Sequence, residues 1–380
     1  MTEPLPFPDS EDDPPPRLPV SVLTGFLGSG KTTLLAHLIR QPEMARVACV
    51  INEFGDVGLD HLLVARSTED TVVLDGGCIC CTVRSDLVDT LCSLFMRRLR
   101  GEVPEFDRVV IETTGLADPA PILHTLMNNP LVAARYRLDG VIATVDAIHG
   151  EGQLDQHPES VKQAAVADRL VVTKSDLAMP DAAASLVGRL RALNPAAVVI
   201  VGAHGAVAPS ALFNAGLYNP ETRSPEVARW LNETAYLDRD GDHGPGCGPG
   251  RGHDHHHPHP HPHPHPHPHA HDRRIASFCL VIDEPLPWER FLDFVDDLID
   301  KHGERVLRLK GLLNVRESEV PLVVHGVQHL FHPVVPLPEW PGADRRSKLV
   351  LITRDLGRDA VEGLLNARLS AVEPWTPSDD

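Results

Sequence analysis

Short apolar runs separated by helical segments dominate the chain up to about residue 220. Runs of this kind are typical of strands buried on both faces of a sheet, and the helices between them predict parallel pairing. The fold class predicted for residues 18–220 is therefore α/β, a doubly wound and mostly parallel sheet that binds ligands at the carboxyl ends of its strands. The expected strands are Pro19–Leu23, Val47–Asn52, Thr71–Leu74, Arg108–Glu112, Gly140–Val145, Arg169–Thr173 and Ala197–Val201.

A smaller C-terminal α+β domain is predicted over residues 273–371. The segment Trp288–His302 carries apolar side chains on one helical face, and strand-like runs lie on both sides of it. The expected elements are strands at Ile275–Ile282, Val306–Val315, Pro321–Val327 and Lys348–Thr353, and helices at Trp288–His302 and Arg358–Ala371. Residues 221–272 are rich in Gly, His and Pro and predict a mobile linker, and residues 1–17 and 372–380 predict tails, the first of them disordered.

The composition is that of a soluble globular protein, and it argues against two classes of partner. The chain has 380 residues, of which 42% are hydrophobic and 23% charged, so there is room for two domains with cores. A formal net charge of −18 argues against nucleic acid as the main partner. No apolar stretch approaches the roughly 18 residues of a membrane helix. The start of the chain lacks the features of a signal peptide, so we expect a cytoplasmic protein.

Residues 25–33 read Gly-Phe-Leu-Gly-Ser-Gly-Lys-Thr-Thr and match the P-loop pattern G-x-x-x-x-G-K-[ST]. An apolar strand precedes the loop and a helical segment follows it, which favours a phosphate site over a plain glycine turn. Backbone N–H groups and the helix N-terminus hold anionic oxygens in such a loop. Lys31 is expected to reach the β- and γ-phosphates, and the Thr32 hydroxyl to bind Mg²⁺. The predicted nucleotide-binding residues of the loop are Gly25, Gly28, Ser29, Gly30, Lys31, Thr32 and Thr33.

A second apolar strand ends in an acid, Glu112, and is followed by Gly115. This is the shape of a Walker B strand. An acid at this position can hold Mg²⁺ through water, and the Gly115 N–H is placed to sense the γ-phosphate and to reset the loop after it. The alternative is a buried strand that ends in a turn, but the position after the glycine loop favours the nucleotide interpretation.

The run Thr173-Lys174-Ser175-Asp176 resembles the [N/T]-K-x-D motif that reads guanine at the end of a strand. The Asp176 carboxylate can accept hydrogen bonds from the N1–H and the 2-amino group of guanine, which adenine does not present, and Lys174 would lie across the base. The tetrapeptide alone is a weak signal, but after a P-loop it favours GTP. Thr173 stands where Asn is commoner, which puts part of the usual bracing of the loop in question. Gly115, Thr173, Lys174 and Asp176 complete the predicted nucleotide-binding set.

Three of the seven cysteines gather at Cys78, Cys80 and Cys81. Adjacent cysteines make a poor disulfide framework, and thiolates are soft ligands suited to Zn²⁺. The three side chains cannot all ligate one ion easily, so we expect two thiolates plus an outside group. Glu53 is a candidate for that outside ligand, and its rival role is to position the attacking water. A cluster of small buried residues and a redox switch are the alternatives.

Eleven of the 22 histidines lie between His253 and His271, mostly alternating with proline. Proline keeps such a segment extended, and neutral imidazole binds Zn²⁺, Co²⁺ or Ni²⁺. Our hypothesis is that this tract gathers metal for the cysteine site, since many weak sites on a tether raise the local metal concentration. The alternative is a low-complexity linker with incidental metal affinity. His325, His329 and His332 are interpreted as surface or core residues rather than ligands.

The chain resembles the CobW-like GTPases in a combination of five motifs: Gly25–Thr33, Asn52-Glu53-Phe54-Gly55, Cys78-Ile79-Cys80-Cys81, Glu112-Thr113-Thr114-Gly115-Leu116-Ala117-Asp118-Pro119 and Thr173-Lys174-Ser175-Asp176. These GTPases are metallochaperones of the SIMIBI class of P-loop proteins. The group includes cobalamin-pathway CobW proteins, zinc-regulated GTP metalloprotein activators and nitrile hydratase activators. The resemblance covers about residues 18–365, because the second domain is similar to the family's C-terminal domain.

The resemblance implies GTP hydrolysis coupled to delivery of zinc, or cobalt, to a client metalloprotein. It implies GTP and Mg²⁺ as cofactors, nucleotide-dependent homodimers, and Cys78, Cys80 and Cys81 as the metal motif with the ligand pair open. The expected catalytic residues are Lys31, Thr32, Glu53 and Glu112. Two other classes remain: a GTP-dependent metal or redox sensor without client delivery, and a P-loop kinase that transfers phosphate to a small acceptor.

Overall fold

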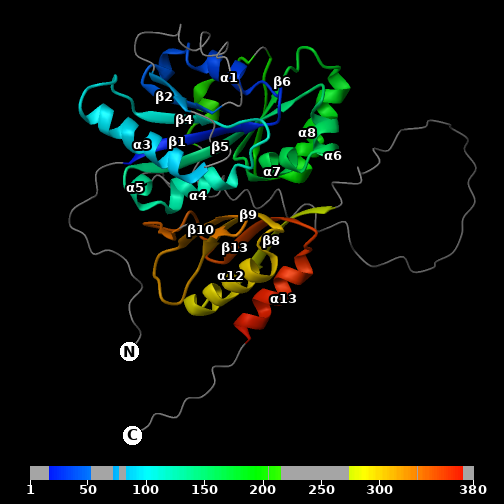
Figure 1. Ribbon diagram of the computed structural model, residues 1–380. Helices are drawn as coiled ribbons and strands as arrows, with labels where there is room; N and C mark the ends of the chain where they lie inside the picture. The colour runs from blue at the N-terminus through cyan, green and yellow to red at the C-terminus, as the bar shows by residue number, and fades with distance from the viewer. Residues whose placement is uncertain are drawn as a thin grey trace, which may run out of the picture.

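The structure is a computed structural model that describes residues 17–52, 72–76, 83–203, 205–214, 274–331 and 333–370. Within these ranges the chain forms two sheets, each covered by helices, and the second sheet lies against the first domain (Figure 1). Three predicted segments lie outside the described residues. They are the linker at residues 221–272, the N-terminal tail except for its last residue, and the C-terminal tail at residues 372–380. Among the described residues, no helix has the length and apolar character needed to cross a bilayer.

All strand pairs described in the first sheet are parallel, as the continuous apolar runs predict. The seven strands lie in the order β3-β2-β4-β1-β5-β6-β7, which puts β1, the strand before the glycine loop, at the centre. The strands are β1 Leu18–Gly25, β2 Val47–Asn52, β3 Val72–Gly76, β4 Arg108–Glu112, β5 Tyr136–Asp146, β6 Arg169–Thr173 and β7 Val198–Val201. The predicted bounds of β2, β4 and β6 are confirmed to the residue.

Helices cover both faces of this sheet (Figure 1). Alternate residues of β1 face two different cores: Val22 packs in a cluster with Leu91 of α3, whereas Leu23 packs in another with Leu34 of α1. This alternation follows from the two-residue period of a strand. The helices are α1 Lys31–Leu38, the 3₁₀ helix η1 Pro42–Met44, α3 Val83–Leu99, α4 Ala120–Asn128, α5 Pro130–Ala133, α6 Gly150–Gln156, α7 Pro158–Val166, α8 Pro180–Leu193 and α9 Pro209–Leu212.

The strand β5 begins four residues earlier than its apolar run predicts, at Tyr136 instead of Gly140. Its first residues alternate between apolar and polar, and Asp139 interrupted the apolar pattern in the sequence. In the fold Asp139 is buried because it accepts hydrogen bonds from Ser21, at 2.9 Å, and from Arg108. Polar partners on β1, the neighbouring strand, and on β4, the strand beyond it, therefore let a carboxylate sit inside the sheet.

The second domain has the α+β class that the sequence predicts, and the structure shows an antiparallel sheet with two helices on one face. Its main strands lie in the order β11-β10-β9-β13-β8, with β12 paired to β10. Phe294 of α12 and Leu365 of α13 pack in one core with Leu309 of β9. The elements are β8 Ile275–Ile282, α12 Trp288–His302, β9 Val306–Leu313, β10 Leu322–Val327, β11 Leu330–Phe331, β12 Val335–Pro336, β13 Ser347–Arg354 and α13 Arg358–Leu369.

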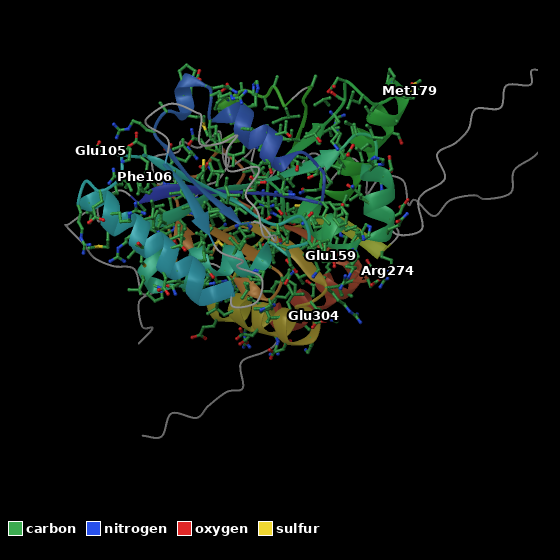
Figure 2. All side chains as sticks on the ribbon, turned by 45° about the horizontal axis from the view of Figure 1, so that its top comes forward. Glu105, Phe106, Glu159, Met179, Arg274 and Glu304 are labelled. Carbon is green, nitrogen blue, oxygen red and sulfur yellow. The ribbon has the colours of Figure 1, made fainter. Side chains whose placement is uncertain are left out.

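The face of the second sheet opposite α12 and α13 packs on the first domain (Figure 1). Leu307 and Ile352 from this sheet share an apolar cluster with Ala164 and Ala165 of α7. In Figure 2 Met179 projects from the first domain on the side away from the yellow and red elements of the second. The two domains are joined through α7 and through the C-terminal end of α8, where Ser277 of β8 donates a hydrogen bond to the carbonyl of Leu193, whereas Met179 precedes the far end of α8.

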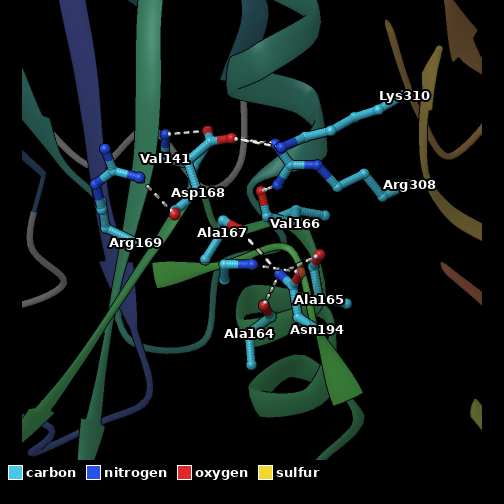
Figure 3. Close-up of polar contacts among 11 residues, drawn as sticks. Val141, Ala164, Ala165, Val166, Ala167, Asp168, Arg169, Asn194, Arg308 and Lys310 are labelled. Atoms are coloured by element: carbon cyan, nitrogen blue, oxygen red, sulfur yellow. Dashed lines mark hydrogen bonds and ion pairs between the residues drawn. The ribbon is translucent and has the colours of Figure 1, made fainter. Parts of the chain in front are cut away.

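A buried ionic cluster lies at the same junction (Figure 3). Asp168, just before β6, accepts hydrogen bonds from Arg308, from Lys310 Nζ at 3.1 Å and from the Val141 N–H at 2.9 Å. Burial alone would raise the pKa of Asp168, but Arg308 and Lys310 hold it below its ordinary value. Burial lowers the pKa of Lys310 to about 7, with a further contribution from Arg308. Two basic side chains thus face one carboxylate in a place where water cannot screen them.

Candidate nucleotide site

The loop between β1 and α1 has the backbone that its glycines predict. Gly25, Gly28 and Gly30 have φ angles of 142°, 70° and 88°, a region that side chains disfavour. A Cβ at Gly25 would also collide with the side chain of Thr144 on β5. The predicted loop residues thus adopt a tight turn at the carboxyl end of the central strand, where parallel sheets bind ligands.

Lys31 is the first residue of α1, and its side chain turns back over the loop. Its Nζ donates hydrogen bonds to the carbonyl oxygens of Gly25, at 2.9 Å, and Phe26, at 3.2 Å. Only 8% of the residue is exposed. A nearly buried ammonium above a turn of backbone N–H groups is an arrangement that attracts anionic oxygens.

Thr32 and Glu112 are in contact although they lie far apart in the sequence. The Thr32 Oγ1 donates a hydrogen bond of 2.7 Å to Glu112 Oε1. Pairing of β1 with β4 sets Glu112 beside Leu23, and Glu112 is 1% exposed. Burial, and then the Glu112 charge, raise the pKa of the neighbouring Cys49 to about 12. A hydroxyl and a carboxylate at this spacing are the oxygen donors that Mg²⁺ prefers, so the residues present fit that ion.

The loop after β4 touches the glycine loop directly. A Cβ at Gly115 would lie 2.6 Å from the backbone nitrogen of Leu27 and 2.7 Å from its Cα. Only glycine permits this approach, because any side chain would push the two loops apart. Gly115 is therefore held directly against the P-loop.

Thr173, at the end of β6, braces the P-loop from behind. Its Oγ1 donates a hydrogen bond of 2.7 Å to the carbonyl of Ser29 and lies 3.3 Å from the carbonyl of Val145. The Ser29 hydroxyl in turn shares a hydrogen bond of 2.6 Å with Thr144 Oγ1. The sequence put the bracing of the loop in question because position 173 is Thr where Asn is commoner. The threonine hydroxyl supplies this bracing.

Lys174 is held by an aspartate that sequence reasoning did not single out. Lys174 has a φ of 55°, and its Nζ lies 2.6 Å from Asp146 Oδ2. Asp146 ends β5, and its Oδ1 accepts hydrogen bonds from the N–H groups of Ile148, at 2.7 Å, and His149, at 3.3 Å. Burial would raise the pKa of Asp146, but the contact with Lys174 and these N–H groups lower it. The signal in the sequence was an acidic residue at the end of β5, the strand that comes before the one ending in Thr173.

These segments surround a cavity of about 540 Å³. It is lined by seven of the predicted residues, namely Gly28, Gly30, Lys31, Thr32, Thr33, Gly115 and Lys174, and by Leu27, Thr113, Thr114 and Leu116, which were not predicted as ligands. Gly25, Ser29 and Thr173 lie behind the cavity wall, where Ser29 and Thr173 are buried. Asp176 is exposed and is not among the lining residues.

The predicted metal ligands fall outside the described residues. This applies to Cys78, Cys80, Cys81 and Glu53, and to the histidine tract between His253 and His271. Within the described ranges, His, Cys, Asp and Glu side chains form no group of three or more that could hold a metal ion. The strands that lead to these segments do meet, because β2 pairs with β3 up to Asn52 and Gly76.

Two protein-family models match the chain in succession. The nucleotide-binding domain of CobW/HypB/UreG matches residues 19–201, and the C-terminal domain of the cobalamin synthesis protein cobW matches residues 275–369. Both matches agree with the two sheets described above. They also confirm the resemblance inferred from the motifs.

Two bacterial relatives match this chain over most of their own length. The zinc chaperone YjiA of Escherichia coli K12 is 31% identical over 90% of this chain and 96% of its own. The zinc chaperone CobW of Pseudomonas aeruginosa is 28% identical over 93% of this chain and 92% of its own. The crystal structure of the Zn(II)-bound YjiA GTPase from E. coli superposes with a TM-score of 0.65, at 27% identity, over 94% of this chain and 100% of that one. The chain therefore belongs to the CobW/HypB/UreG family of GTPases, in its two-domain form with a cobW C-terminal domain.

Proposed function

We propose that this chain is a GTP-hydrolysing metallochaperone that binds zinc through Cys78, Cys80 and Cys81 and delivers it to client metalloproteins. The observation that carries the proposal is the contact between Thr32 and Glu112 beside a cavity that also takes in Lys31. The relatives named as zinc chaperones support the same reading.

The triphosphate is expected to lie along the glycine loop. Lys31 exchanges its bonds to the loop carbonyls for phosphate oxygens, and the helix α1 presents its N-terminus to the same charge. When bound, Mg²⁺ supplies positive charge that neutralises the phosphates, and Thr32 and Glu112 would hold it. Gly115 lies against Leu27, and its N–H is expected to meet the terminal phosphate.

The base is expected to lie over Lys174. The Lys174 ammonium pairs with Asp146, and the aliphatic part of the Lys174 side chain can then cover one face of the purine. Asp176 follows two residues later and supplies the carboxylate that recognises guanine. Asp176 is exposed, which fits a side chain that meets its ligand at the protein surface.

The zinc motif should adjoin the nucleotide site. The chain runs from the carboxyl end of β3 into the cysteines and from that of β2 into Glu53. In the strand order β3-β2-β4-β1, β3 and β1 are three strand spacings apart, or about 14 Å. We propose that nucleotide-dependent movement of the segment containing Glu53 alters the metal site, with Glu53 either ligating the ion or positioning the attacking water. Cobalt is the alternative cargo.

A nucleotide-dependent homodimer is part of the proposal. Leu27 and Leu116 line the cavity, and they are 52% and 54% exposed. Exposed leucines on the rim of a phosphate cavity favour contact with another protein surface. A second copy of this chain, or the client, is expected to cover them when GTP is bound.

Titration of zinc into the protein with bound GDP or a non-hydrolysable GTP analogue tests the coupling. We expect the zinc affinity to differ between the two states, and a double substitution Cys80→Ser with Cys81→Ser to remove tight zinc while sparing GTP binding. Lys31→Ala should remove nucleotide turnover. Tight zinc binding in the double variant would defeat the cysteine assignment. A rate of GTP hydrolysis that does not change with zinc would favour a metal or redox sensor. Formation of a phosphorylated small molecule in place of free phosphate would favour a kinase.

A further inference from the structure

The segment from Gly115 to Asp118 is held in place by side chains from outside the nucleotide loops. Gln163, on α7, donates hydrogen bonds through its Nε2 to the carbonyls of Gly115, at 3.2 Å, and Ala117, at 3.0 Å. Gln163 is only 1% exposed. One amide thus fixes two peptide units of the segment that lies against the P-loop.

Asp118 ends this segment and is held from two domains. Its Oδ2 accepts hydrogen bonds from Lys162 Nζ, at 2.7 Å, and from Gln328 Nε2, at 2.8 Å. Its Oδ1 accepts one from the Ala120 N–H at 3.0 Å. Burial would raise the pKa of Asp118, but Lys162, the Ala120 N–H and Gln328 lower it. The carboxylate is therefore ionised and accepts three hydrogen bonds at once.

Gln328 belongs to the second domain, on the short turn that joins β10 to β11. Its φ of 54° is left-handed, a conformation that only the surrounding contacts can hold in a residue other than glycine. The residue before it, Val327, is buried in the core cluster of the first domain. The turn is thus inserted between the domains with its amide directed at Asp118.

The same helix that holds the segment is anchored to the second sheet. Arg308 of β9 donates a hydrogen bond to the carbonyl of Val166, the last residue of α7, and also binds Asp168 (Figure 3). Lys162 and Gln163 lie one turn earlier on that helix. The second domain therefore reaches the Gly115–Asp118 segment twice, directly through Gln328 and indirectly through α7.

We propose that Gln328 is a positioning residue for GTP hydrolysis, which makes the second domain part of the catalytic apparatus of the first. The inference rests on the proposed GTPase function. Because Gln328 holds Asp118, it limits the conformations open to Gly115 when the terminal phosphate is being transferred. A contact that matters in the transition state more than in the ground state changes kcat more than KM. We also expect the β10–β11 turn to respond when the terminal phosphate is bound, because Gln328 joins this turn to the segment that contains Gly115.

The test compares Gln328→Gly with Gln328→Lys in the full-length chain. Glycine keeps the left-handed backbone and removes the donor, whereas lysine restores a donor that can reach Asp118. We expect Gln328→Gly to lower kcat for GTP about tenfold with KM and GDP affinity nearly unchanged, since a hydrogen bond to a charged group contributes about this much. Gln328→Lys should recover most of the loss.

The control is Ser277→Ala, which removes another hydrogen bond between the domains, 2.8 Å long, from Ser277 Oγ to the carbonyl of Leu193. This variant should hydrolyse GTP as the unmodified chain does. Hydrogen exchange of residues 326–331 gives an independent readout, and it should differ between the GDP and GTP-analogue states in the unmodified chain but not in Gln328→Gly.

Two results overturn the inference. One is an unchanged kcat in Gln328→Gly; the other is an equal loss in Gln328→Gly and Ser277→Ala, which would indicate only weaker domain packing. If the unmodified chain does not hydrolyse GTP, the proposed function fails and the inference fails with it. Normal hydrolysis that is insensitive to Gln328→Gly removes the inference alone.

Discussion

The hydroxyl of Thr173 donates a hydrogen bond of 2.7 Å to the carbonyl of Ser29, and so joins the end of β6 to the P-loop. This contact ties the segment expected to read the base to the loop expected to hold the phosphates. A Cβ at Gly30 would lie 3.5 Å from the same hydroxyl, so the two segments are packed without a gap. The end of β6 and the P-loop are therefore expected to move together as one unit.

Replacing Thr173 by valine removes the hydroxyl and keeps the shape. The Ser29 carbonyl, buried behind the cavity, then loses its partner, which costs about 1–3 kcal/mol. We expect the affinity for a fluorescent GDP analogue to fall roughly 5- to 150-fold. Thr173→Ser, which retains the hydroxyl, is the control and should bind nearly as the unmodified chain does. Equal affinities in the valine and serine variants would show that the hydrogen bond does not stabilise the loop.

Replacing Glu112 by glutamine separates charge from shape in the expected Mg²⁺ site. The Mg²⁺ concentration that gives half-maximal GTP hydrolysis should rise about tenfold or more, because a neutral amide is a weaker ligand for a hard cation. The fold should not weaken, because the substitution also removes a buried charge. Thr32→Ser keeps the hydroxyl and should leave the Mg²⁺ requirement unchanged. A Glu112→Gln protein with an ordinary Mg²⁺ requirement would contradict the assignment.

Replacing Asp146 by asparagine should weaken the preference for GTP over ATP. The amide oxygen can still accept from the Ile148 N–H, but the ion pair that holds Lys174 is lost. We expect the ratio of GTP to ATP affinity, measured by displacement of a fluorescent nucleotide, to fall about fivefold or more. Asp155→Asn is the matched control, because Asp155 pairs with Arg189 away from the cavity. An unaltered ratio in Asp146→Asn would mean that Lys174 needs no anchor.

The buried cluster at the domain junction predicts a dependence of stability on pH. The pKa of Lys310 is lowered to about 7 in the folded chain and is 10.5 in its ordinary state. Between these values the unfolded chain binds more protons, so this residue makes stability rise with pH, by at most about 1.4 kcal/mol per pH unit. Burial is the largest cause of the lowered pKa; Arg308 and Arg169 lower it further, Asp168 raises it, and His325 lies opposite Lys310 on β10.

Substituting Lys310→Met should therefore stabilise the protein most at pH 7 or slightly below, with a gain that shrinks as the pH approaches 10. Asp168 adds nothing in this window, since its lowered pKa affects stability only in acid. Urea unfolding at pH 6.5, 8 and 9.5 measures the difference. Lys301→Met removes an exposed lysine from α12 and should show no such slope. Parallel curves for the two variants would refute the prediction.

Local pattern alone determined much of the first domain. Continuous apolar runs predict β2, β4 and β6 to the residue, because a strand buried on both faces admits few polar side chains. The glycine loop could also be read directly, since positive φ angles and close backbone approach both require glycine. These features depend on residues that are neighbours in the sequence, and they can therefore be predicted from the sequence alone.

Only the tertiary structure decided which polar residues meet. Asp139 could be assigned to a strand only once Ser21 and Arg108 were seen to bind it. Asp146 acquires a role through Lys174, and Asp118 through Gln328, which lies 210 positions further along the chain. A buried carboxylate has to find its donors wherever strand order and domain packing bring them, so its partners follow from the assembled sheets and not from its sequence neighbours.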